Sequence, residues 1–320
     1  MVCALHAFEA DQKEYGLNLL QAFTDDSKAQ AGDKRLFLAG YLHRADVWAL
    51  FSKDWYQELK AWPAIEYLKA SEAHNLGGQF HYSRWDEKLR DAKLARLSAI
   101  ISHYKPISYE VSANGQLFEN ELKPVSPYGF GRLHFTMCFT VVSAVSRYVA
   151  ESPVRAPIRF VFDEQQGVDV DVEMFFSEMI KSLPAEAQNL IDGLPAFKSD
   201  KELQYAPLQA ADFLAWHLRR EHETGEKLAR TNGLIGHDAH LVQEIPDEML
   251  RSWASHHATL PGVPLLQSKQ QWKDFKTMMK TLTDAGIDPS KINGAGVYYP
   301  EGTSALARAI DWVRRRFGRA

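Results

Sequence analysis

The sequence predicts an α/β fold, in which a mixed sheet is flanked by helices and followed by a helical C-terminal extension. Short apolar stretches of strand length alternate, along the first part of the chain, with longer stretches whose apolar residues recur at helical spacing. Beyond Thr224 we recognise helical pieces alone. We therefore expect a core at residues 18–222 and an extension at residues 223–320 that packs on it.

Four segments have the composition of strands, at 17–26, 35–43, 106–113 and 157–163. The first two are separated by the turn formers Gly32 and Asp33, which favours an antiparallel pair. The fourth combines β-branched and aromatic residues and is the clearest strand of the chain. Helices are predicted at 45–62, 79–103, 133–150, 172–183, 207–220, 247–257, 272–285 and 304–317.

The composition limits the class of protein. Hydrophobic residues make up 45% and charged residues 24%, which is typical of a folded soluble chain. The net charge of −4 provides no global basic field for nucleic acid, so any such contact must be local. The two cysteines, Cys3 and Cys138, match no metal or redox spacing, and the most apolar segment, 133–150, is interrupted by polar residues. We expect a cytoplasmic protein without a membrane partner.

The helix that begins near Pro207 carries an aspartate on its apolar face. At about 3.6 residues per turn, Asp212 shares that face with Leu208, Ala215 and Leu218. A bare carboxylate buried there is costly, so it should be protonated, hydrogen-bonded, paired with a cation or bound to a metal. The alternative is an aspartate of the first helical turn, partly open to water and favoured by the helix dipole.

Two predicted strands also end in acidic residues, with Asp25 and Asp26 at the end of the first and Asp163 at the end of the fourth. Functional groups of an α/β sheet gather at the carboxyl ends of adjacent parallel strands, so one fold can bring Asp25, Asp163 and Asp212 together. Their mutual repulsion is ordinarily offset by a hard divalent cation, here Mg²⁺ or Mn²⁺, which suits phosphodiester hydrolysis. The simpler alternative makes Asp25 and Asp26 turn residues.

Five motifs occur in order along the core: TDDS at 24–27, FLAGYL at 37–42, KASEA at 69–73, FVFDE at 160–164 and PLQAADFLAW at 207–216. Together they resemble the uncharacterised family of domains of unknown function numbered 3800. The resemblance implies a ribonuclease H-like fold in which acids from the first strand, an intervening helix, the fourth strand and a late helix hold divalent metal. The last motif is the most specific of the five.

The resemblance assigns roles by position. Asp25, Asp163 and Asp212 are the expected metal ligands and catalytic acids, and Glu72 is the candidate for the assisting acid of the intervening helix. Lys69 and Gln209 are the expected substrate-binding residues, with Lys69 near a phosphate.

Two departures from the family pattern lie beside Asp25. Asp26 replaces the more usual glutamate, and Lys28 stands where glycine often follows the serine. The second departure changes the turn behind Asp25 and leaves room for a site that binds without cutting.

The expected function is a metal-dependent nuclease or related phosphodiesterase acting on nucleic acid or another phosphodiester. One alternative is a non-catalytic ribonuclease H-like scaffold that binds a protein partner. A third possibility is an enzyme acting on a small phosphorylated molecule or nucleotide. A metal ligand triad predicts stabilisation by Mn²⁺, and also by Asp-to-Asn changes in the absence of metal, because repulsion is relieved. A scaffold predicts neither effect.

Overall fold

The computed structural model describes residues 19–28, 34–126, 131–153, 155–164, 172, 176–177, 179–199, 205–227 and 230–259, with scattered positions between 270 and 284. The helix expected at 304–317 lies outside the described residues, as do most residues of the helix expected at 272–285 and residues 173–175 and 178 of the one expected at 172–183. The chain divides into two compact units, Met1–Asn114 with His134–Ile245 and Gly115–Leu133 with Pro246–Ala320.

The first unit is built on a six-stranded sheet with the order β5-β4-β1-β2-β3-β6. The strands are β1 Leu20–Lys28, β2 Leu36–Arg44, β3 Ile107–Ala113, β4 Ile158–Asp163, β5 Ala196–Lys198 and β6 His240–Ile245. β1 and β3 run antiparallel to β2, whereas β4 is parallel to β1, β5 to β4 and β6 to β3. The predicted α/β fold with a mixed sheet is therefore confirmed, and so is the antiparallel pairing of the first two strands.

Both edge strands differ from the sequence-based expectation. β6 lies in the range where helices alone were expected, and β5 was not predicted at all. β5 has only three residues, AFK, and no position of it is fully buried. β6 buries Ile245 alone. β5 is too short and β6 is too little buried to give a clear strand pattern, and each pairs with a longer parallel neighbour, β4 or β3, that supplies its hydrogen bonds.

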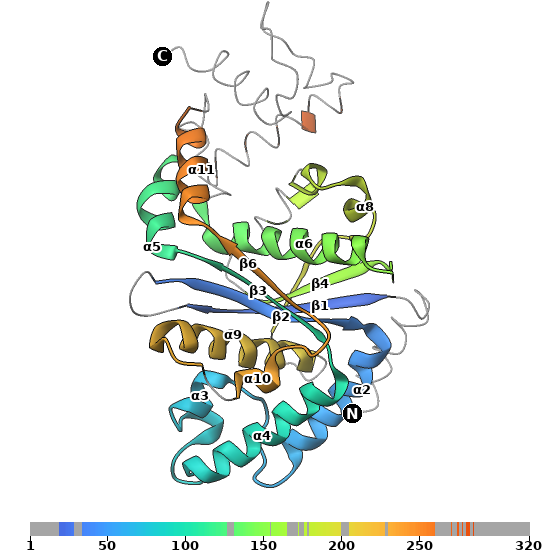
Figure 1. Cartoon of the computed structure of the whole chain (residues 1–320), viewed down its shortest axis with the longest axis vertical. Coiled ribbons are helices and arrows are strands. Elements are labelled where there is room, and N and C mark those ends of the chain that lie inside the picture. Colours follow the sequence, from blue (N-terminus) through green and yellow to red (C-terminus); the bar gives the residue numbers. More distant parts are fainter. Residues whose placement is uncertain are drawn as a thin grey trace, which may run out of the picture. The chain divides into compact units, whose positions relative to one another are not determined.

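Helices cover both faces of this sheet (Figure 1). α6, Leu133–Glu151, lies on one face, and α9, Ala206–Thr224, packs against β1 and β2 on the other. On the α9 side lie α2, Ala45–Lys60; α3, Ala70–His74; α4, Glu87–Tyr104; and α10, Thr231–Leu234. Side chains alternate along β1, so Asp25 faces α9 while Thr24 faces away from it.

α6 is the most apolar helix of the described chain. It meets the length and mean hydropathy that a membrane-crossing helix requires, which corrects the expectation that this segment is too polar. Half of its apolar window is nevertheless buried inside the protein. Val141, Val142 and Val145 are fully buried, as in the core helix of a soluble protein, and this is the buried helix that the sequence predicted.

Gly40 explains the close contact between β2 and β1. A Cβ atom at this position would lie 1.9 Å from the carbonyl oxygen of Phe23. The Tyr109 hydroxyl passes over the glycine from β3, donates to that carbonyl at 3.0 Å and lies 2.8 Å from Thr24 Oγ1. A side chain at position 40 would therefore disturb β1 immediately before Asp25.

The long helix expected at 79–103 is shorter at its start. α4 begins at Glu87, because the Asp86 carboxylate accepts a hydrogen bond from Leu89 N at 2.7 Å and caps the helix. A 3₁₀ turn, η1 at Gly78–Phe80, precedes it. The sequence-based prediction wrongly extended the helix over the polar segment between η1 and α4.

The second unit brings together segments that are remote in sequence. These are α5 at Gly115–Leu117, η2 at Phe118–Leu122, η3 at Lys123–Val125 and α11 at Asp247–Thr259. Ser126 Oγ lies 2.9 Å from His257 Nδ1. Glu121 and Arg251 form an exposed ion pair at 3.6 Å.

Candidate functional site

Asp25 and Asp163 lie on neighbouring parallel strands of the sheet. The last paired positions of β1 and β4 are Thr24 and Phe162, and each aspartate is the next residue along its strand. Neighbouring strands are about 4.8 Å apart, and side chains at equivalent positions share a face. Asp25 is buried, with 3% of its surface exposed, whereas Asp163 is half-buried. The two carboxylates therefore reach the same region from adjacent strands.

Asp212 approaches this region from α9. It lies in the second turn of the helix and is 6% exposed, so the partly hydrated first-turn alternative does not describe it. Its Oδ2 atom accepts a hydrogen bond from Ala70 N at 2.6 Å. This bond satisfies one of the free N–H groups at the start of α3 and ties that short helix to α9.

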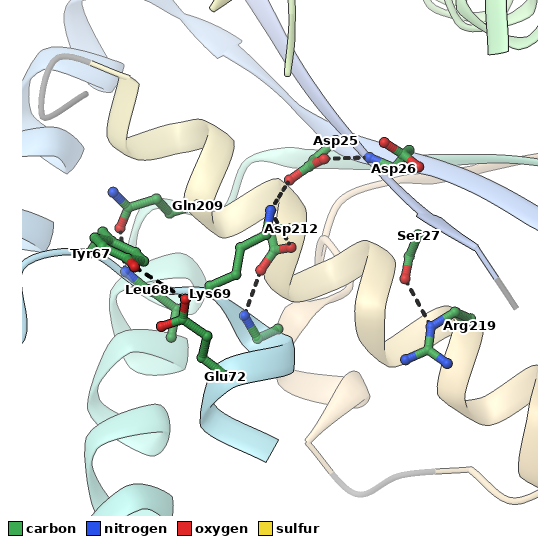
Figure 2. A network of polar contacts seen from close by, with 11 residues as sticks. Asp25, Asp26, Ser27, Tyr67, Leu68, Lys69, Glu72, Gln209, Asp212 and Arg219 are labelled. Carbon is green, nitrogen blue, oxygen red and sulfur yellow. Dashed lines mark hydrogen bonds and ion pairs between the residues drawn. The ribbon is translucent and has the colours of Figure 1, made fainter. Parts of the chain in front are cut away.

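Lys69 occupies the space between two of these carboxylates (Figure 2). Its Nζ atom lies 3.0 Å from Asp212 Oδ1 and 3.4 Å from Asp25 Oδ2. The residue is in extended conformation immediately before α3, and its side chain is 29% exposed. The ammonium group thus supplies a positive charge where the sequence led us to expect a metal ion.

The electrostatic environment of Asp25 disfavours its ionised form. Burial raises the pKa of the Asp25 carboxyl well above its ordinary value, Lys69 opposes this, and the charges of Asp212, Asp163 and Asp26 raise the pKa further. Asp25 also accepts a hydrogen bond from Asp26 N at 2.6 Å. One ammonium group therefore does not offset the negative charge gathered around Asp25.

The carboxylate of Glu72 is not brought to the aspartate cluster. Oε1 accepts a hydrogen bond from the Tyr67 hydroxyl at 3.1 Å, and Oε2 accepts one from Gln79 N at 3.0 Å. Gly78, with φ of +49°, has no room for a Cβ because Glu72 fills that space. In Figure 2 Glu72 points away from Asp25 and Asp212. In this structure Glu72 therefore shapes the loop after α3 and is not brought to the aspartates, and its role as an assisting acid stays a prediction.

Gln209, also expected to bind substrate, lies inside the protein core. It is fully buried, and its Oε1 atom accepts hydrogen bonds from Trp55 Nε1 at 3.0 Å and from Leu68 N at 2.9 Å. Substrate has no access to this oxygen in the conformation described. Gln209 instead fixes the backbone immediately before Lys69, so its effect on the site is positional.

The two departures from the family pattern lie away from the cluster. Asp26 faces the α6 side of the sheet, where its charge raises the pKa of buried Cys138 beyond the larger effect of burial itself. Lys28 is exposed at the last position of β1. Neither side chain occupies the space between Asp25 and Asp212.

The residue types fit a hard divalent cation, since three aspartates converge on one region. Among the described residues, however, no group of three or more His, Cys, Asp or Glu side chains has the spacing to hold a metal ion. In this arrangement Lys69 lies between Asp25 and Asp212, and a metal ion would require it to turn away.

The sequence reasoning overlooked the cationic and aromatic residues that follow Asp212 on α9. Arg219 donates from Nε to Ser27 Oγ at 2.9 Å and lies 5.6 Å above the ring of Trp216. Trp216 contacts the ring of His74 at a centroid distance of 4.8 Å. Trp216 and Arg219 follow Asp212 by four and seven residues, and residues at this spacing share one face of a helix. This spacing could have identified them from the sequence.

Comparisons of the chain with protein-family models, with characterised proteins and with solved structures gave no match.

Proposed function

We propose that this protein is a divalent-metal-dependent phosphodiesterase of the nuclease kind, built on a ribonuclease H-like core. The resemblance assigns metal ligands to the first strand, the fourth strand and a late helix. Asp25, Asp163 and Asp212 lie on β1, β4 and α9, which are those elements in this fold. This agreement of position supports the proposal.

The observation that carries the proposal is the shared ammonium group of Lys69. A single cation reaches carboxylates from β1 and α9, which are 187 residues apart in sequence (212 minus 25), while Asp163 raises the pKa of Asp25 from the adjacent strand. The acids therefore lie within reach of one another, with more negative charge than one ammonium group neutralises. A doubly charged ion complements this charge better.

Each residue then has a defined task. Asp25, Asp163 and Asp212 would hold the ion, and Mg²⁺ or Mn²⁺, when bound, supplies an activated water and steadies the leaving oxygen of a phosphodiester. Lys69, released from the carboxylates, is placed to contact the phosphate. Ala70 N keeps Asp212 oriented throughout, since that hydrogen bond does not involve Lys69.

The test is cleavage by the purified full-length chain. Labelled DNA, RNA and the small diester bis-p-nitrophenyl phosphate are incubated with Mg²⁺ or Mn²⁺, using wild type, Asp163→Asn and Asp212→Asn. We expect metal-dependent cleavage by the wild type alone. The matched control is Asp238→Asn, because Asp238 is exposed, and it should cleave like the wild type. Absence of cleavage of every substrate with both metals would reject the proposal.

Lys69 also favours a second candidate, the non-catalytic scaffold that binds a protein partner. An ammonium group that bridges two aspartates is a complete structural interaction without any metal. On this account neither metal alters the melting temperature. A rise in melting temperature with Mn²⁺ that Asp163→Asn removes would exclude it.

A further inference from the structure

A basic surface lies beside the acidic cluster on the α9 side of the sheet. We define it by four arginines around two aromatic rings: Arg90 on α4, Arg219 and Arg220 on α9, Arg230 before α10, with His74 and Trp216. We propose that this basic surface binds the backbone of a polynucleotide, so that the substrate is a nucleic acid strand and not a small phosphorylated molecule. The inference rests on the proposed function, because the acidic cluster is taken as the place of cleavage.

The charges of the basic surface do not cancel. Glu223 is shared by Arg219 and Arg220, the latter at 3.7 Å. Asp91 is likewise shared by Arg90 at 3.0 Å and Arg230 at 3.4 Å. Each carboxylate thus faces two guanidinium groups, and the two sets leave an excess of two positive charges. Such an excess, in a chain whose net charge is −4, favours a polyanion at this place.

The aromatic rings give the basic surface a second property of nucleic-acid sites. His74 is exposed and contacts Trp216, whose ring is largely buried and lies 5.6 Å below the Arg219 guanidinium. The pKa of His74 is lowered, first by partial burial and then by Arg220, Arg90 and Arg219, so the imidazole is neutral at neutral pH. A neutral exposed ring among guanidinium groups is suited to stacking on a base beside its phosphate.

The position of the basic surface relative to the acids defines the path that a bound nucleic acid strand would follow. Asp212, Trp216, Arg219 and Arg220 follow one another along α9 at intervals of four, three and one residues. At about 1.5 Å per residue Arg219 lies about 10 Å along the helix axis from Asp212. That distance equals the rise of about three nucleotides along the axis of a duplex, at ~3.4 Å per nucleotide. A backbone that reaches Lys69 and the aspartates therefore continues over Arg219 and Arg220.

The exposed arginines allow a test that does not depend on cleavage. The side chains of Arg220 and Arg230 are 40% and 29% exposed, whereas Arg219 is 12% exposed and holds Ser27. The experiment measures fluorescence anisotropy of labelled single-stranded and duplex DNA and RNA with the full chain in EDTA. It compares wild type with Arg220→Ala/Arg230→Ala. Arg147→Ala, an exposed arginine on α6 at the opposite face of the sheet, is the matched control.

We expect the double variant to bind the polynucleotide about tenfold more weakly and to lower the salt slope by about two, because each lost phosphate contact removes about one. The control should bind like the wild type, and the melting temperature of the double variant checks that it is folded. Arginine-dependent binding without any cleavage would keep this inference and reject the hydrolytic function. Cleavage of bis-p-nitrophenyl phosphate without polynucleotide binding would do the reverse.

Two other results would overturn the inference. One is equal binding by wild type and the double variant. The other is arginine-dependent binding to vesicles of anionic lipid with no binding to DNA or RNA, which would identify the basic surface as a membrane contact. The charge-reversing change Arg220→Glu provides a second variant, and it should weaken polynucleotide binding more than Arg220→Ala does.

Discussion

The ammonium nitrogen of Lys69 lies 3.0 Å from Oδ1 of Asp212, while Oδ2 of the same aspartate accepts the N–H of Ala70, the next residue along the chain. Two consecutive residues, one through its side chain and one through its backbone, therefore hold a single carboxylate on α9. Asp25 has the longer of the two ion pairs with Lys69, since its Oδ2 atom lies 3.4 Å from the same nitrogen. The two buried aspartates thus differ in how well the protein stabilises their charge.

Replacing Lys69 by methionine tests the ammonium group as the internal cation of the site. The change leaves Asp25 and Asp212 without their shared positive charge, so the free energy of unfolding should fall by about 1–3 kcal/mol without metal, less than for a fully buried pair because Lys69 is partly exposed. Added Mn²⁺ should raise the melting temperature more in Lys69→Met than in wild type, since no ammonium competes. Chemical and thermal denaturation in EDTA and in Mn²⁺ measure both effects.

The matched control for this prediction is Lys53→Met, on the exposed side of α2. It should change the free energy of unfolding by less than about 0.5 kcal/mol, as ordinary surface substitutions do. A Lys69→Met variant as stable as wild type in EDTA would show that the ion pairs contribute nothing and would contradict the prediction.

Asparagine substitutions at Asp25 and Asp212 should shift stability in opposite directions without metal. Because burial raises the pKa of Asp25, its ionised form is costly, and Asp25→Asn should stabilise the fold by about 1 kcal/mol. Asp212→Asn has only one oxygen for the two donors, Ala70 N and Lys69 Nζ, and should destabilise it by about 1–2 kcal/mol. From the sequence alone, an Asp-to-Asn change was expected to stabilise the fold at each of the proposed metal ligands. The sequence indicated repulsion between the acids but did not show their hydrogen-bond and ion-pair partners.

Urea denaturation near neutral pH in EDTA measures both free energies. Asp238→Asn serves as the exposed control and should leave stability unchanged within about 0.5 kcal/mol. Equal stabilisation by Asp25→Asn and Asp212→Asn would mean that Lys69 does not hold Asp212 in solution.

Two of the elements that the sequence predicted, β4 and α9, have a composition that reflects extensive burial. β4 has four buried positions among its six residues, and α9 is buried continuously from Ala206 to Leu218, so composition alone identifies them. The edge strands β5 and β6 lack such burial and depend on neighbours that the sequence does not identify. The start of α4 has another cause, since it is fixed by the Asp86 cap.

The aspartates of the candidate site could be predicted from the sequence, whereas the placement of the Lys69 ammonium group between them could not. Asp25 and Asp212 were identified because a carboxylate at a strand end or on an apolar helix face is conspicuous. Lys69 and Glu72 are three residues apart and would share a face if their segment were helical, with Glu72 as the assisting acid and Lys69 near a phosphate. The conformation of Lys69 is extended and outside α3, so its side chain is directed to the aspartates while Glu72 closes the loop with Gln79. Such a difference arises from backbone dihedrals that residue spacing does not encode.

Gln209 provides a stability prediction that separates positioning from substrate contact. Gln209→Leu keeps the side chain close in size but leaves Trp55 Nε1 and Leu68 N buried without this acceptor, which should cost about 2–4 kcal/mol. Gln57→Leu, exposed on α2, is the matched control and should be near neutral. Denaturant unfolding measures both. A Gln209→Leu variant of unchanged stability that nevertheless binds polynucleotide more weakly would restore the role of a substrate contact.

The last prediction concerns pH and involves Glu110, on β3. Burial, and then the charge of Glu221, raise the pKa of Glu110 to about 7 from an ordinary value of 4.5. Its Oε2 atom is buried without a hydrogen-bond partner in the described part of the chain, 3.8 Å from Nε2 of His240, whose own pKa is lowered by burial. Glu110 therefore keeps its proton in the folded protein over a range where the unfolded chain has already released it.

The sign of the effect follows from this difference. The cost of ionising Glu110 is fully present above about pH 7, declines as the pH falls and is absent below 4.5; at ~1.4 kcal/mol per pH unit it amounts to about 3 kcal/mol. Glu110→Gln should thus raise the free energy of unfolding by about 2–3 kcal/mol above neutral pH and by almost nothing at acidic pH, which urea unfolding across the range measures. Glu66→Gln, an exposed control, should show no such dependence. A gain for Glu110→Gln that is the same at every pH would mean that packing, and not ionisation, is the cause.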